Sequence, residues 1–254
     1  MQSYVPSRPL RDRVVSIERV SSQGHSSQVL PAAGAVLGLQ VSGHVLGPDG
    51  PLSSFGVTGI QDGVRRYSYD EPTETFLVRF RPQGATCLGV PADLLSGRSL
   101  SLDELWGAPG RARAAALMDA LLATSDTTRR VALLEAFLMS LPFRRDLRLE
   151  RALELLGQPE RDDVRARVAV AARELSLSER HLERLFLERV GISPKRYARL
   201  RRFEHAARLA RDGQRLGKVA FAAGYADQAH LIREFKKFSG TTPRRFVRTG
   251  NFVE

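Results

Sequence analysis

The sequence predicts an α+β N-terminal domain, with a small antiparallel sheet or partial barrel plus helices, followed by an all-α domain. The all-α domain is expected to contain two helix-turn-helix units. Alternating β-forming residues lie between Ala35 and Arg81, which is typical of short strands. Beyond Pro142 the chain reads as short arginine-rich helices with no strand-like segment, and one pattern occurs there twice. We therefore expect domains over residues 1–142 and 147–250.

The expected strands follow an amphipathic stretch, residues 10–20, and a polar linker. They are AVLGLQVSGHVL (35–46), FGVTGI (55–60), VRRYSY (64–69) and TFLVRFR (75–81). GPDGP (47–51) is a turn signal, because proline and glycine favour the backbone angles of turns. Pro82 ends the last strand, since proline has no amide hydrogen to offer a neighbouring strand.

Helical segments are expected at 92–95, 102–106, 111–123 and 127–141. The third has apolar residues at helical spacing, namely Ala114, Leu117, Met118, Leu121 and Leu122. The fourth has a similar stripe, formed by Val131, Leu134, Phe137, Leu138 and Leu141. Such stripes usually form the core, and a paired-helix dimer interface is the alternative that the pattern leaves open.

The composition is that of a globular protein, with 43% hydrophobic and 26% charged residues. The single cysteine, Cys87, excludes an internal disulfide and a cysteine-based zinc cluster. The N-terminus lacks the apolar core of a secretory signal, and no apolar run approaches the ~20 residues of a membrane span. We therefore expect a cytoplasmic protein with no membrane partner.

The basic charge is concentrated in the second domain. Residues 145–254 hold 25 of the 39 lysines and arginines but only 15 of the 28 aspartates and glutamates. Most of the net charge of +11 therefore belongs to this part. A solvated basic face is one interpretation, and phosphate binding is the other.

The repeated pattern is SERHLERLFLERVGISPKRY (178–197) and DQAHLIREFKKFSGTTPRRF (227–246). Equivalent positions lie 49 residues apart within these stretches and 48 apart upstream of them. The second copy therefore has one additional residue in its turn, where insertions are tolerated.

Each copy predicts the same series of elements. A first helix, 165–174 or 216–223, is followed by a turn, an N-cap residue and a second helix. Glycine suits the left-handed position after the second helix, and proline suits the first turn of the next helix. The N-caps, glycines and prolines are Ser178 and Asp227, Gly191 and Gly240, and Pro194 and Pro243. This is the helix-turn-helix pattern.

Helix pairs repeated at such a spacing also build solenoids that contact proteins. A solenoid normally needs three or more repeats, and its exposed faces need not be basic. With two copies in a basic domain, DNA binding is the stronger interpretation.

Residues from about 150 to 248 resemble the C-terminal domain of AraC/XylS-type transcription regulators. Three motifs carry the resemblance: S-x-x-x-L-x-R-x-F-x-x-x-x-G-x-S-P-x-x-Y (178–197), R-x-x-x-A-x-x-L (202–209) and V-A-F-A-A-G-Y-x-D-x-x-H-L-x-R-x-F-K-x-x-x-G-T-T-P-x-x-F (219–246). The resemblance implies seven C-terminal helices in two units joined by a long helix. Ser176 stands where the first turn of the family usually has glycine, so we expect a strained or reshaped turn.

The N-terminal half resembles a sensor-type domain found upstream of such units. FLVRFRPQGATCLGVPADLL (76–95) and LDELWG (102–107) carry this resemblance. It implies effector sensing, dimerisation or both. The ligand-binding residues are not identified by the sequence.

The joining helix is expected at 194–211, a length of about 27 Å at ~1.5 Å per residue. Successive major-groove faces lie ~34 Å apart. One chain could therefore place both second helices in adjacent major-groove segments on one face of double-stranded DNA.

The exposed early residues of the two second helices are predicted to read bases. They are Glu179, Arg180, Glu183 and Arg184, and Gln228, Ala229, Ile232 and Arg233. Arginine suits guanine, glutamine suits adenine, glutamate suits cytosine, and apolar side chains suit the thymine methyl. For Glu183, an ion pair with Arg180 inside the helix is the alternative.

Other basic residues are predicted to contact phosphates and so to supply affinity without sequence information. They are Lys195, Arg196, Arg199, Lys236, Lys237, Arg244 and Arg245, together with His181 and His230, for which packing is the alternative. The two histidines are too isolated to predict a metal site.

The N-terminal half shows no catalytic spacing of carboxylates, histidines or Cys87, so we expect no enzyme activity, no cofactor and no metal. Arg79 and Arg81 alternate on a strand, where an anionic ligand is possible in principle but a surface role is favoured. We expect a DNA-binding transcription regulator controlled by an effector, and RNA polymerase and a second copy of the chain are further partners that remain open. The alternatives are a non-specific nucleic-acid-binding or architectural protein, and a regulator fused to an enzyme-like domain.

Overall fold

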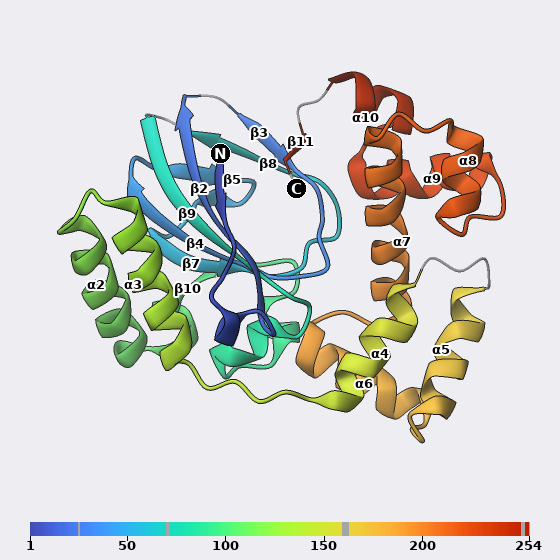
Figure 1. The fold of residues 1–254 in the computed structure, drawn as a ribbon, viewed down its shortest axis with the longest axis horizontal. Helices are drawn as coiled ribbons and strands as arrows, with labels where there is room; N and C mark the ends of the chain where they lie inside the picture. Colours follow the sequence, from blue (N-terminus) through green and yellow to red (C-terminus); the bar gives the residue numbers. More distant parts are fainter. Residues whose placement is uncertain (25, 70–71, 159–162, 250–251, 254) are drawn as a thin grey trace.

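The computed structural model describes residues 1–24, 26–69, 72–158, 163–249 and 252–253. Sheets and a helical hairpin form the N-terminal half, and helices form the C-terminal half (Figure 1). Helix α7 (Pro194–Arg211) stands beside the sheets, and the other C-terminal helices lie toward its two ends (Figure 1). The predicted fold class, an α+β part followed by an all-α part, is confirmed.

The strands form two sheets. The larger is antiparallel with the order β1-β2-β9-β4-β7-β10. Its strands are β1 (Gln2–Tyr4), β2 (Val14–Gln23), β9 (Pro72–Phe80), β4 (Val36–Ser42), β7 (Phe55–Thr58) and β10 (Ser99–Ser101). The smaller has the order β11-β3-β8-β5-β6, with β11 (Phe252–Val253), β3 (Ser27–Val29), β8 (Arg65–Tyr69), β5 (Val45–Gly47) and β6 (Gly50–Pro51).

The two faces of the larger sheet have different neighbours. On β9, Phe76, Val78 and Phe80 share a buried core with leucines of helices α2 (Ala108–Leu122) and α3 (Thr127–Ser140). The alternate residues of the same strand, Thr75, Leu77 and Arg79, line a cavity on the other side. Alternate side chains of a strand point to opposite faces, so one face carries the core and the other faces the smaller sheet.

The remaining short helices of the N-terminal half are η1 (Arg8–Leu10), η2 (Gly84–Leu88), η3 (Ala92–Leu95) and α1 (Leu102–Trp106). The helical segments expected at 92–95, 102–106, 111–123 and 127–141 all occur, with small shifts at the ends of the two longer ones. Their apolar stripes pack mainly into the core, as Leu117, Leu121, Leu134 and Leu138 show.

Strands β1, β2, β3, β10 and β11 were not anticipated, and the short strand β6 lies in the segment expected as a turn. The amphipathic stretch 10–20 is largely strand β2, because a bulge between Val14 and Ser16 lets Val14 and Ile17 both enter the core at a spacing that looks helical. The expectation of no strand beyond Pro142 is also wrong, because β11 pairs in parallel with β3. A strand of this length has too little sequence to be recognised.

Seven helices make up the described C-terminal half. They are α4 (Leu147–Gly157), α5 (Val164–Glu174), α6 (Glu179–Val190), α7, α8 (Leu216–Ala222), α9 (Gln228–Ser239) and α10 (Pro243–Thr249). The pairs α5–α6 and α8–α9 are the two helix-turn-helix units, and α7 joins them. Within the described residues, no helix is long and apolar enough to cross a membrane.

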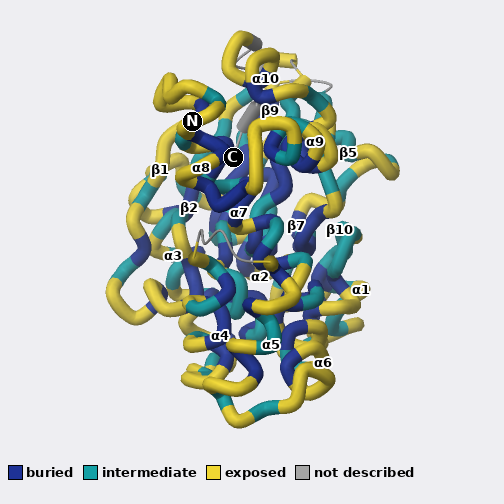
Figure 2. Tube along the Cα trace, turned by 90° about the vertical axis from the view of Figure 1, so that its right-hand side faces the viewer, coloured by how far each residue is buried: buried dark blue, intermediate teal, exposed yellow. Residues whose placement is uncertain are grey.

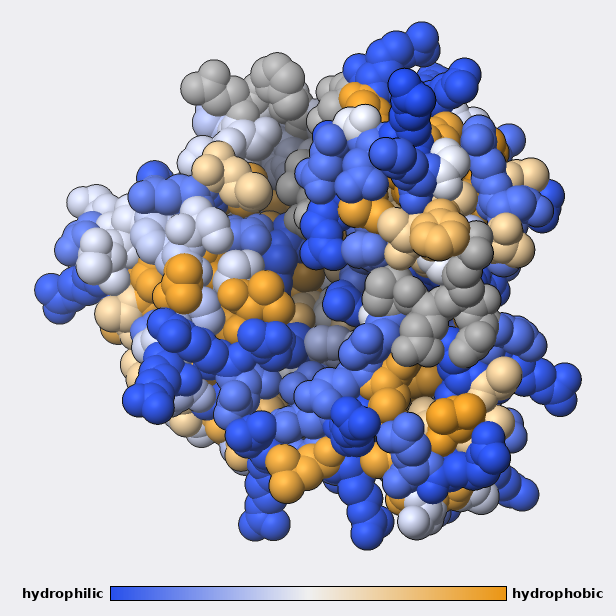
Figure 3. Space-filling model, turned by 45° about the vertical axis from the view of Figure 1, so that its right-hand side comes forward, coloured by the Kyte–Doolittle hydropathy of each residue, from blue (hydrophilic) through white to orange (hydrophobic). Residues whose placement is uncertain are grey.

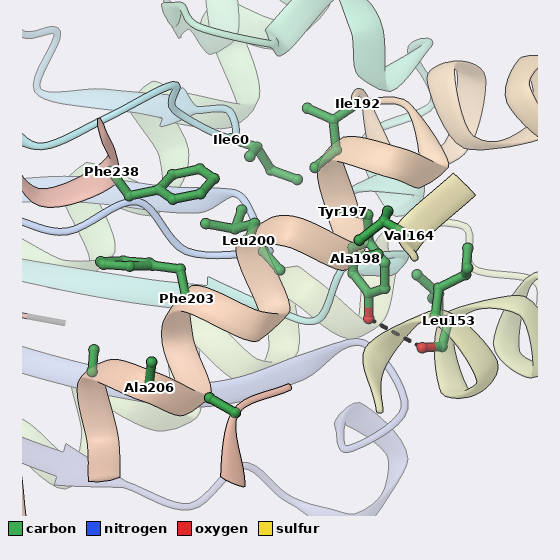
Figure 4. Close-up of a cluster of buried hydrophobic side chains, with 14 of the residues drawn as sticks. Ile60, Leu153, Val164, Ile192, Tyr197, Ala198, Leu200, Phe203, Ala206 and Phe238 are labelled. Atoms are coloured by element: carbon green, nitrogen blue, oxygen red, sulfur yellow. Dashed lines mark hydrogen bonds between the residues drawn. The ribbon is translucent and has the colours of Figure 1, made fainter. Parts of the chain in front are cut away.

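The core of the C-terminal half is built around α7, whose inner residues are buried along most of its length (Figure 2). Figure 4 shows Leu200 and Phe203 of α7 with Phe238 of α9 and, beside them, Ile60 from the loop after β7. Leu30 and Ala33 belong to the same cluster. The two halves therefore share apolar contacts, and the division at residues 142–147 stays a prediction; residue 250 lies outside the described residues.

Candidate nucleic-acid interface

The second helix of each unit begins at the predicted N-cap. The hydroxyl of Ser178 accepts a hydrogen bond from the His181 amide at 3.2 Å. The carboxylate of Asp227 accepts one from the His230 amide at 2.6 Å. Such caps satisfy amides that have no partner inside the helix, so they fix where α6 and α9 start. Both predicted N-caps are confirmed.

The turn before each cap follows the same path in both units. Ser176 has φ 54° and the equivalent Gly224 has φ 73°. The next residues, Leu177 and Tyr225, donate equivalent backbone hydrogen bonds of 2.9 Å and 2.8 Å to the preceding helix. The first turn is therefore kept in shape although it lacks glycine. It carries left-handed strain of roughly 1 kcal/mol, the usual cost for a residue with a Cβ atom.

The glycines that end the second helices are left-handed, as predicted, with φ 90° at Gly191 and φ 69° at Gly240. Gly191 has a second constraint. A Cβ atom there would lie 2.6 Å from the carbonyl oxygen of Ala92 in η3. The end of α6 therefore needs glycine both for its own conformation and for its contact with the N-terminal half.

The predicted base-reading residues of α6 share one exposed face. Glu179, Arg180, Glu183 and Arg184 are all exposed, whereas Leu182 and Phe186 on the opposite face are fully buried. Residues three or four positions apart lie on the same face of a helix. The four exposed residues therefore form one face, and the two buried residues form the face that packs against the core.

Helix α9 presents the same positions of the repeat. Gln228, Ala229 and Arg233 are exposed and Ile232 is half-buried, while Leu231 and Phe235 are buried. The surface over the C-terminal helices is mostly hydrophilic, with separate smaller hydrophobic patches (Figure 3). The structure thus brings each predicted set together on its own helix, with α6 before the start of α7 and α9 packed alongside α7 (Figure 1).

Arg184, on the exposed face of α6, makes only weak, solvent-exposed interactions with its neighbours. Arg184 lies 3.1 Å from the ring of His181 and 4.0 Å from Glu188, and the Arg184 and Glu188 side chains are more than half exposed. Exposed pairs of this kind contribute little to stability, so Arg184 can exchange them for another acceptor. Among the described residues Glu183 makes no ion pair, so the alternative pairing with Arg180 is absent.

The predicted phosphate contacts fall into two groups. Lys195, Lys236, Lys237, Arg244 and Arg245 are exposed, as is His181. His230 is half-buried, with its ring edge-on to Tyr225 at 5.3 Å between centroids, which favours packing for this residue.

Arg196 and Arg199 have partners inside the protein. Arg196 forms an ion pair with Asp62 of the N-terminal half. Nε of Arg199 lies 2.5 Å from Glu234 Oε1. The structure thus gives both arginines protein carboxylates where phosphates were expected, and for Arg199 the carboxylate is buried.

The sequence did not reveal the buried ionic cluster behind α9. Glu234 accepts hydrogen bonds from Arg199 and Arg202 of α7, and the Arg202 guanidinium lies 4.5 Å from the centre of the Tyr225 ring. Burial and, after it, the neighbouring Glu234 raise the pKa of Tyr225, so its hydroxyl stays neutral. The cluster fixes the second helix-turn-helix unit on α7. The first unit has Leu185 at the position of Glu234, so the repeat gave no signal for it.

An aromatic pair closes each unit at equivalent positions. The rings of Phe186 and Tyr197 are 5.6 Å apart, and those of Phe235 and Phe246 are 5.2 Å apart. The hydroxyl of Tyr197 donates to the Leu153 carbonyl at 3.4 Å (Figure 4), and burial raises the pKa of Tyr197 to about 12. These buried rings help to position α6 and α9.

The N-terminal half contacts both units. Helix η3 packs on α6, and the amide of Val64 donates to the Phe238 carbonyl at the end of α9 at 2.9 Å. On α7, Glu204 accepts a hydrogen bond from the Ala33 amide at 2.7 Å. Helices α6 and α9 are therefore held in part by contacts with the half of the chain that does not carry them.

A cavity of about 740 Å³ lies between the two sheets, and a larger one of about 1080 Å³ lies between the sheets and helices α4 and α7. Arg79, which lines both, is bound to Glu18, and Arg81 donates to the Arg11 carbonyl.

Cys87 is fully buried, and burial raises the pKa of its thiol to about 11. Cys87 is therefore a small residue of the N-terminal core. Within the described ranges, no cluster of three or more His, Cys, Asp or Glu residues is arranged to hold a metal.

The fold and the helix-turn-helix units have counterparts among known proteins. Residues 171–249 match the family described as "Helix-turn-helix domain", of the AraC type. ToxT from Vibrio cholerae O395 has a similar structure, with 14% identity, 91% of this chain and 97% of ToxT covered, and a TM-score of 0.50.

Two further ToxT structures are similar. One is bound to (E)-4-(8-methylnaphthalen-1-yl)but-3-enoic acid, with 13% identity, 91% and 98% coverage and a TM-score of 0.52. The other, from Vibrio cholerae strain SCE256, is bound to an unsaturated fatty acid, with 12% identity, 95% and 98% coverage and a TM-score of 0.50. The chain thus has the ToxT fold over nearly its whole length.

Proposed function

Because residues 171–249 form a helix-turn-helix domain of the AraC type, we propose that this chain is a sequence-specific DNA-binding transcription regulator. Helices α6 and α9 of one chain read two adjacent major-groove segments. The observation that carries the proposal is that both helices expose the same positions of the repeat, while α6 directly precedes α7 and α9 is bound to α7 through Glu234.

The length of α7 fits this arrangement. It has 18 residues and is about 27 Å long at ~1.5 Å per residue. With the widths of the flanking helices added, it approaches the ~34 Å between successive major-groove faces of a duplex. A single chain then reads a site without twofold symmetry, because α6 and α9 carry different side chains.

The exposed side chains give each helix a distinct base preference. Arg180 and Arg184 suit guanine edges and Glu183 suits the amino group of cytosine. On α9, Gln228 suits adenine, Arg233 suits guanine, and Ala229 and Ile232 suit thymine methyl groups. Since α9 offers fewer polar readers, we propose that it is the weaker discriminator.

Phosphate contacts from Lys195, Lys236, Lys237, Arg244 and Arg245 would add affinity for any duplex. Arg196 joins them when its ion pair with Asp62 opens, which is plausible because the Asp62 side chain is 81% exposed. Arg199 serves instead to position Glu234. RNA polymerase and a second copy of the chain remain predicted partners.

Control by a small molecule is the second part of the proposal. The proteins of similar fold include ToxT bound to carboxylic acids, and this chain has a cavity between its sheets. Gly59 and Gln61 line that cavity, while Asp62 and Val64 of the same loop contact α7 and α9. A ligand that moves this loop would therefore act on the DNA-binding half.

Selection from random duplex DNA tests the proposal. We expect a bipartite motif whose halves are about one helical turn apart. The control is Arg129→Ala. Arg129 is an exposed residue of α3, which lies on the side of the sheets away from the C-terminal helices (Figure 1). This variant should select the same motif as the wild type. Binding without any enriched motif would instead indicate a non-specific nucleic-acid-binding protein.

A further inference from the structure

The cavity between the sheets has the size of a small-molecule site. Its volume is about 740 Å³, within the range of about 300–1,000 Å³ that is usual for ligand pockets. Strands β2, β4 and β9 of the larger sheet and β3, β5 and β8 of the smaller one contribute to its wall. It lies on the face of the larger sheet opposite the α2–α3 core, the face that is turned toward the smaller sheet.

Its wall combines apolar side chains with neutral polar ones. The apolar members come from both sheets and include Val20, Val29, Val36, Val45, Leu52 and Leu77. The hydroxyl groups include those of Ser22, Ser27, Thr58, Thr75, Tyr67 and Tyr69. Burial is the largest influence on Tyr67 and raises its pKa, so this hydroxyl is neutral at physiological pH.

The charged members of the described wall already have partners. They are Arg79 and Glu104. Nε of Arg79 donates to both carboxylate oxygens of Glu18, at 2.8 Å and 2.9 Å. Glu104 accepts hydrogen bonds from the amide and hydroxyl of Ser101 at 2.7 Å and 2.9 Å. Within this part of the wall, no cation is left to neutralise a ligand.

Two polar atoms of the wall residues have no partner. Oε1 of Gln61 and Oγ1 of Thr75 are buried and make no hydrogen bond, although both residues line the cavity. A buried acceptor without a donor costs free energy. The wall residues therefore hold hydrogen-bond acceptors that the protein itself leaves without a donor.

We propose that this cavity binds an uncharged ligand with an apolar body and one or more hydroxyl groups, and that it excludes carboxylates. This inference rests on the proposed control by a small molecule and specifies its chemistry. A buried carboxylate without a cation is strongly disfavoured, whereas a hydroxyl group finds hydrogen-bond partners among the neutral hydroxyl side chains of the wall, such as Ser22 and Tyr67. The chain would then differ from ToxT, which has been solved with carboxylic acids bound.

Two probes with the same acyl chain test the ligand class: 1-monododecanoylglycerol, which is neutral with two hydroxyl groups, and dodecanoate. Their binding to the full chain is measured by isothermal titration calorimetry below the micelle concentrations, with native mass spectrometry for stoichiometry. We expect one glycerol ester per chain and a Kd at least about tenfold lower than that of dodecanoate. Tighter binding of dodecanoate, or binding of neither probe, overturns the proposal.

Substitutions locate the site. Gly38 lines the cavity, and a Cβ atom there meets only the Leu77 side chain, at 3.7 Å, so Gly38→Phe should fill the space and abolish ester binding. Gly38→Ala is the matched control and should retain it. Unchanged ester binding in Gly38→Phe, with wild-type thermal unfolding, would place the ester elsewhere and overturn the proposal.

A charge variant tests the reason for the preference. Glu18→Gln removes the partner of Arg79 and should lower the Kd for dodecanoate by about tenfold or more. No gain for dodecanoate in a folded Glu18→Gln protein would contradict the role assigned to the Arg79–Glu18 pair. DNA selection with the same wild-type preparation tests the DNA-binding proposal separately from the ligand proposal. An enriched DNA motif would support DNA binding whether or not either probe binds.

Discussion

Arg202 on α7 and Glu234 on α9 form a buried ion pair, with Nη2 of Arg202 2.7 Å from Oε2 of Glu234 and both side chains less than one-tenth exposed. Arg199 holds the second carboxylate oxygen. Helix α9 is therefore attached to α7 by charge as well as by apolar contacts. Its orientation depends on one buried carboxylate.

Glu234→Gln should destabilise the protein by about 3–5 kcal/mol, because it leaves the buried Arg202 without a counter-charge. The free energy of unfolding is measured by urea titration. Glu154→Gln is the control, since Glu154 pairs with Arg151 at the surface and is 65% exposed; its effect should stay below about 1 kcal/mol. Equal effects of the two substitutions would show that the buried pair does not hold α9 in place.

The two turns should respond in opposite senses to an exchange of their central residues. Gly224→Ser places a Cβ atom at φ 73° and should destabilise by roughly 1 kcal/mol. Ser176→Gly relieves the strain at φ 54°, but it also frees the unfolded chain, so its net effect should be smaller and not destabilising by more than about 0.5 kcal/mol. Thermal unfolding checks both, and a clear loss in Ser176→Gly would mean that Ser176 makes a contribution beyond its backbone.

Acid should weaken the N-terminal half through Glu74. Burial alone would raise the pKa of Glu74, but hydrogen bonds from Arg19 and Arg130 outweigh it and hold the pKa below its ordinary value of 4.5. A lowered folded-state pKa stabilises the protein above the unfolded-state value, and this stability is lost as the pH falls through the folded-state pKa.

Glu74→Gln should therefore lower the unfolding temperature at neutral pH and flatten its decline below about pH 4.5. Thermal unfolding across this range compares it with wild type, and Glu154→Gln serves again as the surface control. If the unfolding temperature of Glu74→Gln fell as steeply with decreasing pH as that of the wild type, Glu74 would not be the cause of the acid destabilisation.

Freeing Arg196 should strengthen binding to every duplex alike. Asp62→Asn removes its ion-pair partner, so the guanidinium becomes available to a phosphate. The slope of log K against log salt should then steepen by about 1, as expected for one further phosphate contact. Asp119→Asn, an exposed change of equal charge on α2, is the control. An unchanged slope in Asp62→Asn would exclude Arg196 from the DNA contact.

Local features were predictable from the sequence. The repeat located the caps Ser178 and Asp227, the left-handed glycines and the bounds of α7, because each depends on residues within one or two helical turns. The deviation at Ser176 was also visible, since its partner in the second copy is a glycine.

Features that depend on distant contacts were not predictable. Ile60 lies in the core of the C-terminal half, and Asp62 reaches Arg196 across more than half of the chain. The bulge in β2 hid a strand behind a helix-like spacing. Arg199 looked like a phosphate ligand because basic charge alone does not show which way a side chain turns.

The central claim is that α6 and α9 of one chain read two separate halves of one site. It is tested most directly by comparing the DNA specificity profiles of Arg184→Ala, Arg233→Ala and the control Arg129→Ala. We expect each reading-face substitution to relax preference at a base in a different half of the motif, by about 1–3 kcal/mol, and to leave the other half unchanged. If Arg184→Ala and Arg233→Ala instead weakened all duplexes equally, the claim would be contradicted.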